Sequence, residues 1–184
     1  NHFYAEIAKA VVDLATSYGY TVILCITKND TKLQENYINI LKQRKIDGFL
    51  FASANLRDTQ IKQLETGKTP FVLLNRRLEN NHNINYVVLD NEFGAFMAVE
   101  HLVNLGHRRI AFISGQRIFS TFLERHRGYK NALNYFGLEF DENLVMEGCW
   151  QDEKQAFKST KRLLNHNRPP TAIIAANDLM AFNA

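Results

Sequence analysis

Six short stretches of the chain are apolar at every position, and none of them alternates apolar with polar residues. A strand with one face in water alternates, whereas a strand covered by helices on both faces is apolar throughout. The pattern therefore predicts an α/β fold with mainly parallel sheets and helices on both sides. The six stretches are residues 22–24, 49–51, 71–74, 87–89, 110–113 and 173–175.

Between these stretches, apolar residues recur every three or four positions, the spacing of one face of an α-helix. This spacing predicts helices over residues 3–18, 31–45, 58–66, 92–104, 122–136 and 153–165, with a last helix beginning at Asp178. Strands are predicted over residues 20–26, 49–52, 70–74, 86–89, 110–113, 144–150 and 171–176. The polar segment 75–85 is predicted to be a surface loop.

The apolar faces indicate which side of two helices is buried. In the helix over residues 122–136, Tyr129, Leu133 and Phe136 are predicted to point inward. In the helix over residues 153–165, the shared face is that of Phe157, Thr160 and Leu164.

The stretch 86–115 is predicted to form a strand, a crossover helix and a second strand, because crossovers of this kind join parallel strands. Asp90 or Asn91 can cap the start of the helix, and Gly106 supplies the left-handed residue after its end. Two successive β/α sets then meet near Ser114. This predicts two lobes, residues 1–113 and 116–184, with a hinge crossing at 114–115.

Composition excludes several classes of protein. The chain has 184 residues and a formal net charge of +3, with Lys and Arg interspersed with Asp and Glu, so charge alone indicates no nucleic-acid surface. Cys25 and Cys149 lack any C-x-x-C partner, which argues against a disulfide framework or a thiol metal site and favours a reducing compartment. No apolar stretch is long enough to cross a bilayer, and the first residues form no signal peptide. We expect a cytoplasmic protein.

Hydrogen-bonding residues follow nearly every predicted strand, and in parallel α/β sheets the ligand crevice lies beyond the carboxyl ends of the strands. Any one Asn, Asp or Ser at a helix start is usually a cap, so only their convergence makes a site. Amides, carboxylates and hydroxyls beside Trp150 suit a neutral polyol such as a sugar. These residues are Asn29, Asp30, Ser53, Asn55, Asn75, Arg76, Asp90, Asn91, Ser114, Gln151, Asn177 and Asp178.

Signatures of catalysis, metal binding and cofactor binding are absent from the sequence. It contains no G-x-S-x-G elbow, no Walker or dinucleotide glycine pattern, and no H-E-x-x-H spacing. Cys149 could act as a nucleophile, but no base is evident near it, so a structural thiol is the preferred interpretation. We therefore expect no enzyme, metal or cofactor.

Several motifs resemble the ligand-binding region of the lactose and galactose repressor (LacI) family of bacterial transcription regulators. They occur in the family's order from end to end of the chain, and the Leu-Gly-His-Arg-Arg run is the most specific. The motifs are residues 1–7, 47–48, 89–91 with 94–95, 105–113, Arg125 with 128–129, and 169–172 through 177–181.

The resemblance implies a periplasmic-binding-protein-like fold of two doubly wound lobes, with a small effector in the cleft between them. It also implies a homodimer formed side by side, coupled through the first lobe and its first two helices. Operator DNA would be bound by a helix-turn-helix headpiece that precedes this region and is not in the sequence. A first strand just before Asn1 and a portion after Ala184 are likewise expected by the resemblance.

The family's effector contacts fall on six positions of this sequence. Trp150 matches an aromatic that follows a strand, and Cys149 stands where the family commonly has an Asp. A structural hydrogen bond is the preferred role for Asp90. The six implied contacts are Phe3, Tyr4, Asp90, Arg125, Trp150 and Asn177.

The preferred hypothesis is the effector-sensing and dimerisation module of a LacI-type repressor that binds a pentose, a hexose or a derivative. The main alternative is an exported sugar-binding protein of a transporter, which shares the fold and the Asn-Asp-Leu-Met-Ala pattern. The Gly-His-Arg-Arg-Ile run and the free cysteines favour the regulator. A small α/β enzyme remains a third hypothesis.

Overall fold

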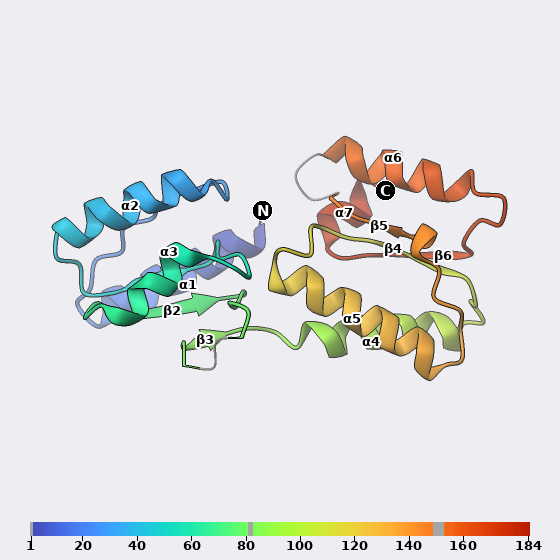
Figure 1. The fold of residues 1–184 in the computed structure, drawn as a ribbon, viewed down its shortest axis with the longest axis horizontal. Helices are drawn as coiled ribbons and strands as arrows, with labels where there is room; N and C mark the ends of the chain where they lie inside the picture. The colour runs from blue at the N-terminus through green and yellow to red at the C-terminus, as the bar shows by residue number, and fades with distance from the viewer. Residues whose placement is uncertain (1, 81–82, 149–152) are drawn as a thin grey trace. The chain divides into compact units, whose positions relative to one another are not determined.

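The computed structural model describes residues 2–80, 83–148 and 153–184. The chain divides into two compact units, residues 1–46 and 47–184. Figure 1 shows the helices and strands of each unit. The described helices and strands confirm an α/β fold with parallel sheets.

The first unit contains α1 (His2–Ser17) and α2 (Thr31–Gln43), close to the predicted helices. Gly19 ends the first helix in a left-handed conformation, with φ of 79°. Asp30 begins the second helix because its carboxylate accepts hydrogen bonds from the backbone N–H groups of Lys32 and Leu33, at 2.8 and 3.1 Å. The predicted cap at this position is confirmed.

The predicted strand over residues 20–26 is wrong. This segment has no paired strand among the described residues, and Ile23 and Leu24 are 59% and 69% exposed. A strand is defined by hydrogen bonds to a neighbour, so an apolar, β-branched run without such a neighbour remains irregular.

The second unit begins with a parallel sheet in the order β1-β2-β3, made of β1 (Phe49–Phe51), β2 (Phe71–Leu74) and β3 (Tyr86–Val87). Phe49 lies opposite Phe71, and Leu73 lies opposite Tyr86. Helix α3 (Thr59–Lys62) and the 3-10 helix Gln63–Thr66 bury Ile61 and Leu64.

A second parallel sheet in the same unit has the order β5-β4-β6, with β4 (Ile110–Ile113) between β5 (Val145–Met146) and β6 (Ala172–Ala175). A short 3-10 helix, Glu142–Leu144, leads into β5. Figure 1 shows α4 (Asn91–Asn104) and α5 (Ser120–Tyr135) on one side of this sheet, and α6 (Glu153–Leu164) and α7 (Asp178–Phe182) on the other. All four residues of β4 are buried, as a strand covered on both faces should be.

The crossover unit predicted over residues 86–115 is wrong, because its two strands belong to different sheets. Strand β3 pairs with β2, whereas β4 pairs with β5 and β6. Helix α4 buries Val99 in the core around β4. The chain therefore passes from one sheet to the other between Val87 and Asn91. Local spacing does not reveal which strands pair. The hinge crossing at 114–115, between lobes of residues 1–113 and 116–184, stays a prediction.

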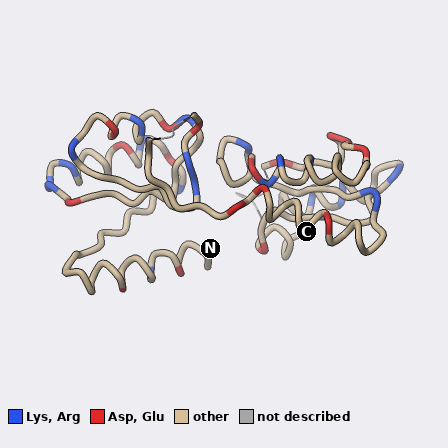
Figure 2. Tube along the Cα trace, turned by 90° about the horizontal axis from the view of Figure 1, so that it is seen from below, with Lys and Arg blue, Asp and Glu red and all other residues tan. Residues whose placement is uncertain are grey.

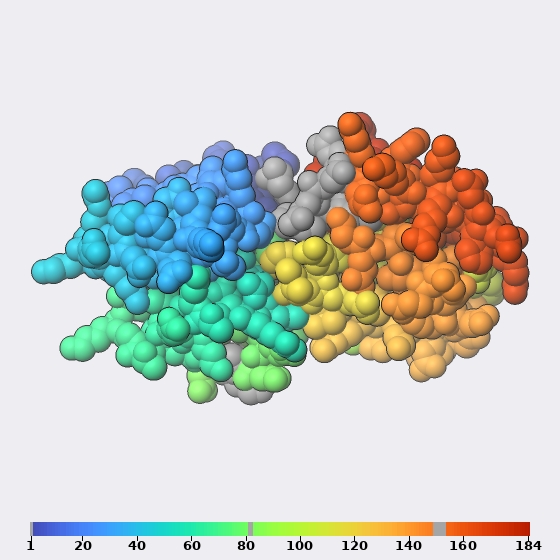
Figure 3. Space-filling model, turned by 45° about the horizontal axis from the view of Figure 1, so that its top comes forward, coloured from blue at the N-terminus to red at the C-terminus, as the bar shows by residue number. Residues whose placement is uncertain are grey.

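Helix faces were predicted correctly in α5 and wrongly in α6. Tyr129 and Leu133 of α5 are buried as expected, whereas Phe136, just after the end of the helix, is only half-buried. In α6 the buried residues are Ala156, Ser159 and Leu163, whereas Phe157 and Leu164 are 60% and 57% exposed. The large apolar side chains suggested the wrong face, since two of the three buried residues are small ones. Figure 3 shows α6 in orange at the molecular surface.

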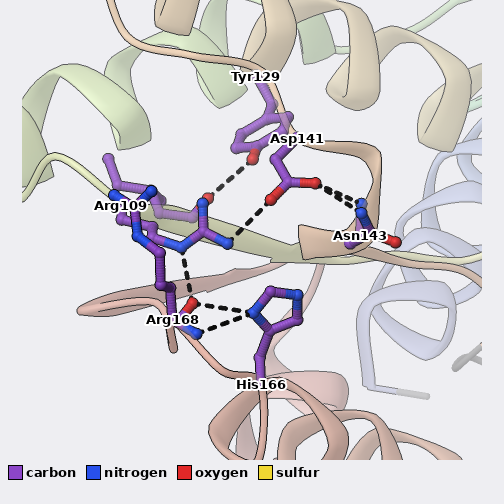
Figure 4. Close-up of polar contacts among 7 residues, drawn as sticks. Arg109, Tyr129, Asp141, Asn143, His166 and Arg168 are labelled. Atoms are coloured by element: carbon purple, nitrogen blue, oxygen red, sulfur yellow. Dashed lines mark hydrogen bonds and ion pairs between the residues drawn. The ribbon is translucent and has the colours of Figure 1, made fainter.

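Arg109, which lies just before β4, binds the segments that contain Asp141 and Arg168 (Figure 4). Its Nη2 donates to Asp141 Oδ2 at 2.9 Å, and its Nε donates to the carbonyl oxygen of Arg168 at 2.8 Å. Asp141 also accepts the backbone N–H of Asn143 at 3.0 Å. These hydrogen bonds, chiefly the one from Arg109, hold the pKa of Asp141 below its ordinary value.

Candidate functional site

The segments that follow β1 and β4 are joined by a backbone hydrogen bond. The N–H of Leu56 donates to the carbonyl oxygen of Ile118 at 2.8 Å. Both residues lie beyond the carboxyl ends of their strands, the edge at which parallel α/β sheets bind ligands. The carboxyl ends of the two sheets therefore meet within the second unit.

Arg76 strengthens this junction from the end of β2. Its guanidinium carbon lies 4.0 Å from the centre of the Phe119 ring, a cation–π contact. This contact joins two halves of the second unit: the first half is the β1-β2-β3 sheet with α3, and the second half is the β5-β4-β6 sheet with α4, α5, α6 and α7. The residue is 3% exposed, and its Nη1 donates to the carbonyl oxygen of Ala54 at 3.5 Å. The polar loop after β2 is therefore anchored to the second half rather than free on the surface.

Arg77 makes a second bridge from the same loop. Its backbone N–H donates to Ser120 Oγ at 3.0 Å, and its Nε donates to Glu124 Oε1 at 2.6 Å. The Glu124 side chain is 7% exposed and that of Arg77 is 42% exposed. Burial acts to lower the pKa of Arg77, but the Glu124 carboxylate outweighs it, so this pKa is raised and the guanidinium stays charged.

Arg125, the next residue on α5, is held by two elements. Its Nε donates to Asn91 Oδ1 at 2.9 Å, and its Nη1 donates to the carbonyl oxygen of Ala176, just after β6. Asn91 Nδ2 in turn donates to Glu124 Oε2 at 2.9 Å and to the carbonyl oxygen of Leu89 at 3.1 Å. The guanidinium is thus oriented at the carboxyl ends of the strands.

Gly128, three residues after Arg125 on α5, lies at a close contact between α5 and α4. A Cβ atom at this position would overlap the backbone carbonyl group of Glu92 in α4. The glycine lets α4 and α5 approach closely, and this approach brings Asn91 within reach of Glu124 and Arg125.

Of the predicted contacts in the second unit, Asp90 and Asn177 serve as helix caps. Asp90 Oδ1 accepts the N–H of Phe93 at 2.9 Å, and Asn177 Oδ1 accepts the N–H of Met180 at 2.9 Å. Asn177 nevertheless adjoins Ala176, the partner of Arg125, so these two predicted residues lie near each other.

Phe3, Tyr4 and Trp150 are the three remaining predicted contacts. Phe3 and Tyr4 are in α1 of the first unit, where their rings form an edge contact with centres 5.3 Å apart. Trp150, with Cys149, lies outside the described residues. Sequence reasoning missed Arg77 and Glu124 altogether, because their separation of 47 positions along the chain hides their pairing. Only the folded structure shows that Glu124 is buried and Arg77 half-buried.

The described side chains of the site contact one another by hydrogen bonds. No group of three or more His, Cys, Asp or Glu residues within the described ranges could hold a metal ion. Ser114 follows β4, and its Oγ is buried with no hydrogen-bond partner inside the part of the chain that the structure describes. Figure 2 shows Lys and Arg interspersed with Asp and Glu along the trace.

Across the ranges described above, every helix is too short or too polar to traverse a bilayer.

Comparison with known proteins gives matches over the full chain. The family model described as periplasmic binding proteins and sugar binding domain of LacI family matches residues 1–184. Catabolite control protein A of Priestia megaterium is 32% identical over 183 residues, covering 99% of this chain and 54% of that protein. The chain thus spans about half the length of this curated relative.

Solved structures agree with the fold. The transcription regulator CcpA of Lactococcus lactis superposes with a TM-score of 0.89 at 28% identity, covering 100% of this chain and 66% of that one. The transcriptional regulator CelR in complex with cellobiose gives 0.87 at 30% identity, covering 99% of this chain and 55% of that one. With the family model matched from the first residue to the last, this chain belongs to the family of periplasmic binding proteins and LacI-type sugar-binding domains.

Proposed function

We propose that this chain is the effector-sensing region of a LacI-type transcription regulator and that it binds a small sugar or sugar derivative. The observation that carries the proposal is the position of Arg125, which is oriented by Asn91 and Ala176 where the carboxyl ends of the strands converge. A guanidinium presents several donors in a fixed plane, which suits paired hydroxyls on a ring.

The relatives support a regulator rather than an enzyme. The matched proteins are named as a control protein and as transcription regulators, and one of them is described in complex with cellobiose. We assign the corresponding contacts in this chain to Arg125, Asn177, Asp90, Trp150, Phe3 and Tyr4, as the family resemblance implies.

The proposed mechanism is a shift between two arrangements of the sheet halves. An effector that contacts residues from both halves binds better where the halves meet and therefore favours that arrangement. In the complete protein this changes the geometry of a homodimer, formed in part through α1 and α2, and so the grip of a preceding headpiece on operator DNA.

Isothermal titration calorimetry of the complete natural protein tests the proposed ligand class. The panel is a set of pentoses, hexoses, disaccharides and their phosphates, with nucleobases and nucleosides as the counter-panel. We expect saturable binding of at least one sugar, at one site per chain. If no sugar binds and a nucleobase does, the ligand class is wrong.

A gel-shift titration with the protein's operator DNA tests the regulatory part. The sugar found by calorimetry should alter operator affinity, while a stereoisomer that fails to bind serves as the control. Unchanged operator affinity at saturating sugar would contradict the allosteric proposal and leave a binding protein without a regulatory role.

A further inference from the structure

Four side chains form a continuous chain of hydrogen bonds through α5. Arg77 Nε donates to Glu124 Oε1 at 2.6 Å, Asn91 Nδ2 donates to Glu124 Oε2 at 2.9 Å, and Arg125 Nε donates to Asn91 Oδ1 at 2.9 Å. The two carboxylate oxygens of Glu124 thus serve different partners.

The two ends of this chain belong to different sheet halves. Arg77 follows β2 of the first sheet, whereas Asn91, Glu124 and Arg125 lie on α4 and α5, which cover the second. Only Arg77 reaches Glu124 from the first half among the described contacts. The charge of the buried carboxylate is therefore balanced from across the junction.

We propose that Glu124 is a positioning residue that couples the contact between the two halves to the orientation of Arg125. This inference rests on the proposed effector site, since it says how the contact between the two halves affects that site. When the halves touch, Arg77 neutralises Glu124, Glu124 fixes the Asn91 amide, and Asn91 directs the Arg125 guanidinium.

The physical reason is the cost of a buried charge without its partner. If the halves separate, Arg77 leaves and the Glu124 carboxylate, 7% exposed, keeps only a neutral amide donor. The carboxylate then rotates toward water, and the Asn91 amide keeps only its hydrogen bond to the carbonyl oxygen of Leu89. Asn91, one of the two acceptors that orient Arg125, is then less firmly fixed, and the carbonyl oxygen of Ala176 alone does not set the plane of the guanidinium. The effector site is consequently complete only in the joined arrangement.

A second ion pair provides a matched control. Arg57 Nε lies 3.0 Å from Glu79 Oε2, and both residues belong to the first half. Their side chains are 86% and 43% exposed, so this pair is solvated and spans no junction. Its removal should leave both the junction and Arg125 unaffected.

The test uses the complete natural protein without any effector and has two readouts. The first is hydrogen–deuterium exchange at the amide of Leu56, which donates across the junction to Ile118. The second is the rate at which phenylglyoxal modifies Arg125, followed by mass spectrometry. The test variants are Arg77→Ala, Glu124→Gln and the double variant that carries both substitutions. Glu124→Gln removes the buried negative charge. Arg57→Ala is the control, and the folding of each variant is checked by circular dichroism.

We expect Arg77→Ala and Glu124→Gln each to accelerate both readouts about tenfold or more, the loss of a hydrogen bond to a charged group. The double variant should match Glu124→Gln alone, because the two residues act as one unit. Arg57→Ala should resemble the wild type. If Arg77→Ala leaves the modification rate of Arg125 unchanged, or if Arg57→Ala alters it equally, the coupling is disproved. Because no effector is present, these outcomes are independent of whether the sugar panel succeeds.

Discussion

Gly128 of α5 lies directly against the backbone carbonyl group of Glu92 in α4, with no room for a side chain between the two helices. This contact sets the separation of α4 and α5, and therefore the reach of Asn91 to Glu124 and Arg125. The absence of a side chain at Gly128 thus allows the close packing of α4 and α5, the two helices that carry the proposed site.

Gly128→Ala should destabilise the protein by about 1–3 kcal/mol, because the added methyl group forces the helices apart. Chemical denaturation measures the change. Gly94→Ala is the control, since a Cβ at this helical glycine meets no atom within 4 Å. That variant should gain about 1 kcal/mol from helix propensity. Equal effects of the two substitutions would show that the helix contact is not tight.

Asp141→Asn should weaken the protein at neutral pH by about 1–2 kcal/mol, because it removes a charge-assisted hydrogen bond to Arg109. The wild-type pKa of Asp141 is lowered in the folded state, so its contribution is present above the unfolded value and is lost as the pH falls through the folded value. In urea titrations, the free energy of unfolding of the variant should fall less between neutral and acid pH than that of the wild type. Glu142→Gln, which alters an exposed neighbour, is the control.

His126 should make stability fall as the pH drops below about 6.5. The side chain is 7% exposed and its Nε2 lacks a partner in the described part of the chain. Burial chiefly lowers its pKa, with Arg117 and Lys130 acting in the same direction and Glu142 against them. The unfolded chain therefore takes up a proton at higher pH than the folded chain does, which favours unfolding. Thermal unfolding between pH 8 and pH 5, about the unfolded pKa, should be less pH-dependent in His126→Leu than in the wild type. An identical pH profile would refute the assignment.

The local elements were predictable because their signals are local. The Asp30 cap, the left-handed Gly106 with φ of 93°, and the inward face of Tyr129 and Leu133 all follow from residues within one or two turns. Burial on both faces of β4 also follows from its unbroken apolar run.

What failed depended on partners distant in sequence. Residues 20–26 have strand composition but no paired strand among the described residues, and β3 joins a different sheet from β4 although only α4 separates them. The same limit concealed the site. Arg125 was found through its motif, but the bridge from Arg77 to Glu124 has no local signature.

Arg125 also contributes to the stability of the folded chain through its hydrogen bonds. The family pattern alone predicts a side chain devoted to the effector, with little effect on folding. Its hydrogen bonds to Asn91 and Ala176 imply that Arg125→Ala costs about 1–2 kcal/mol of stability in addition to any binding defect. Thermal unfolding without effector measures this cost.

The most direct test of the proposed site is a calorimetric titration of the complete protein with the sugar that binds most tightly, comparing Arg125→Ala with Arg127→Ala. Arg127 is an exposed arginine two positions along the same helix. Arg125→Ala should bind the sugar about tenfold more weakly or worse, because the variant loses the hydrogen bonds of a charged donor. Arg127→Ala should bind the sugar like the wild type. Folded Arg125→Ala protein that binds the sugar with wild-type affinity would contradict the account.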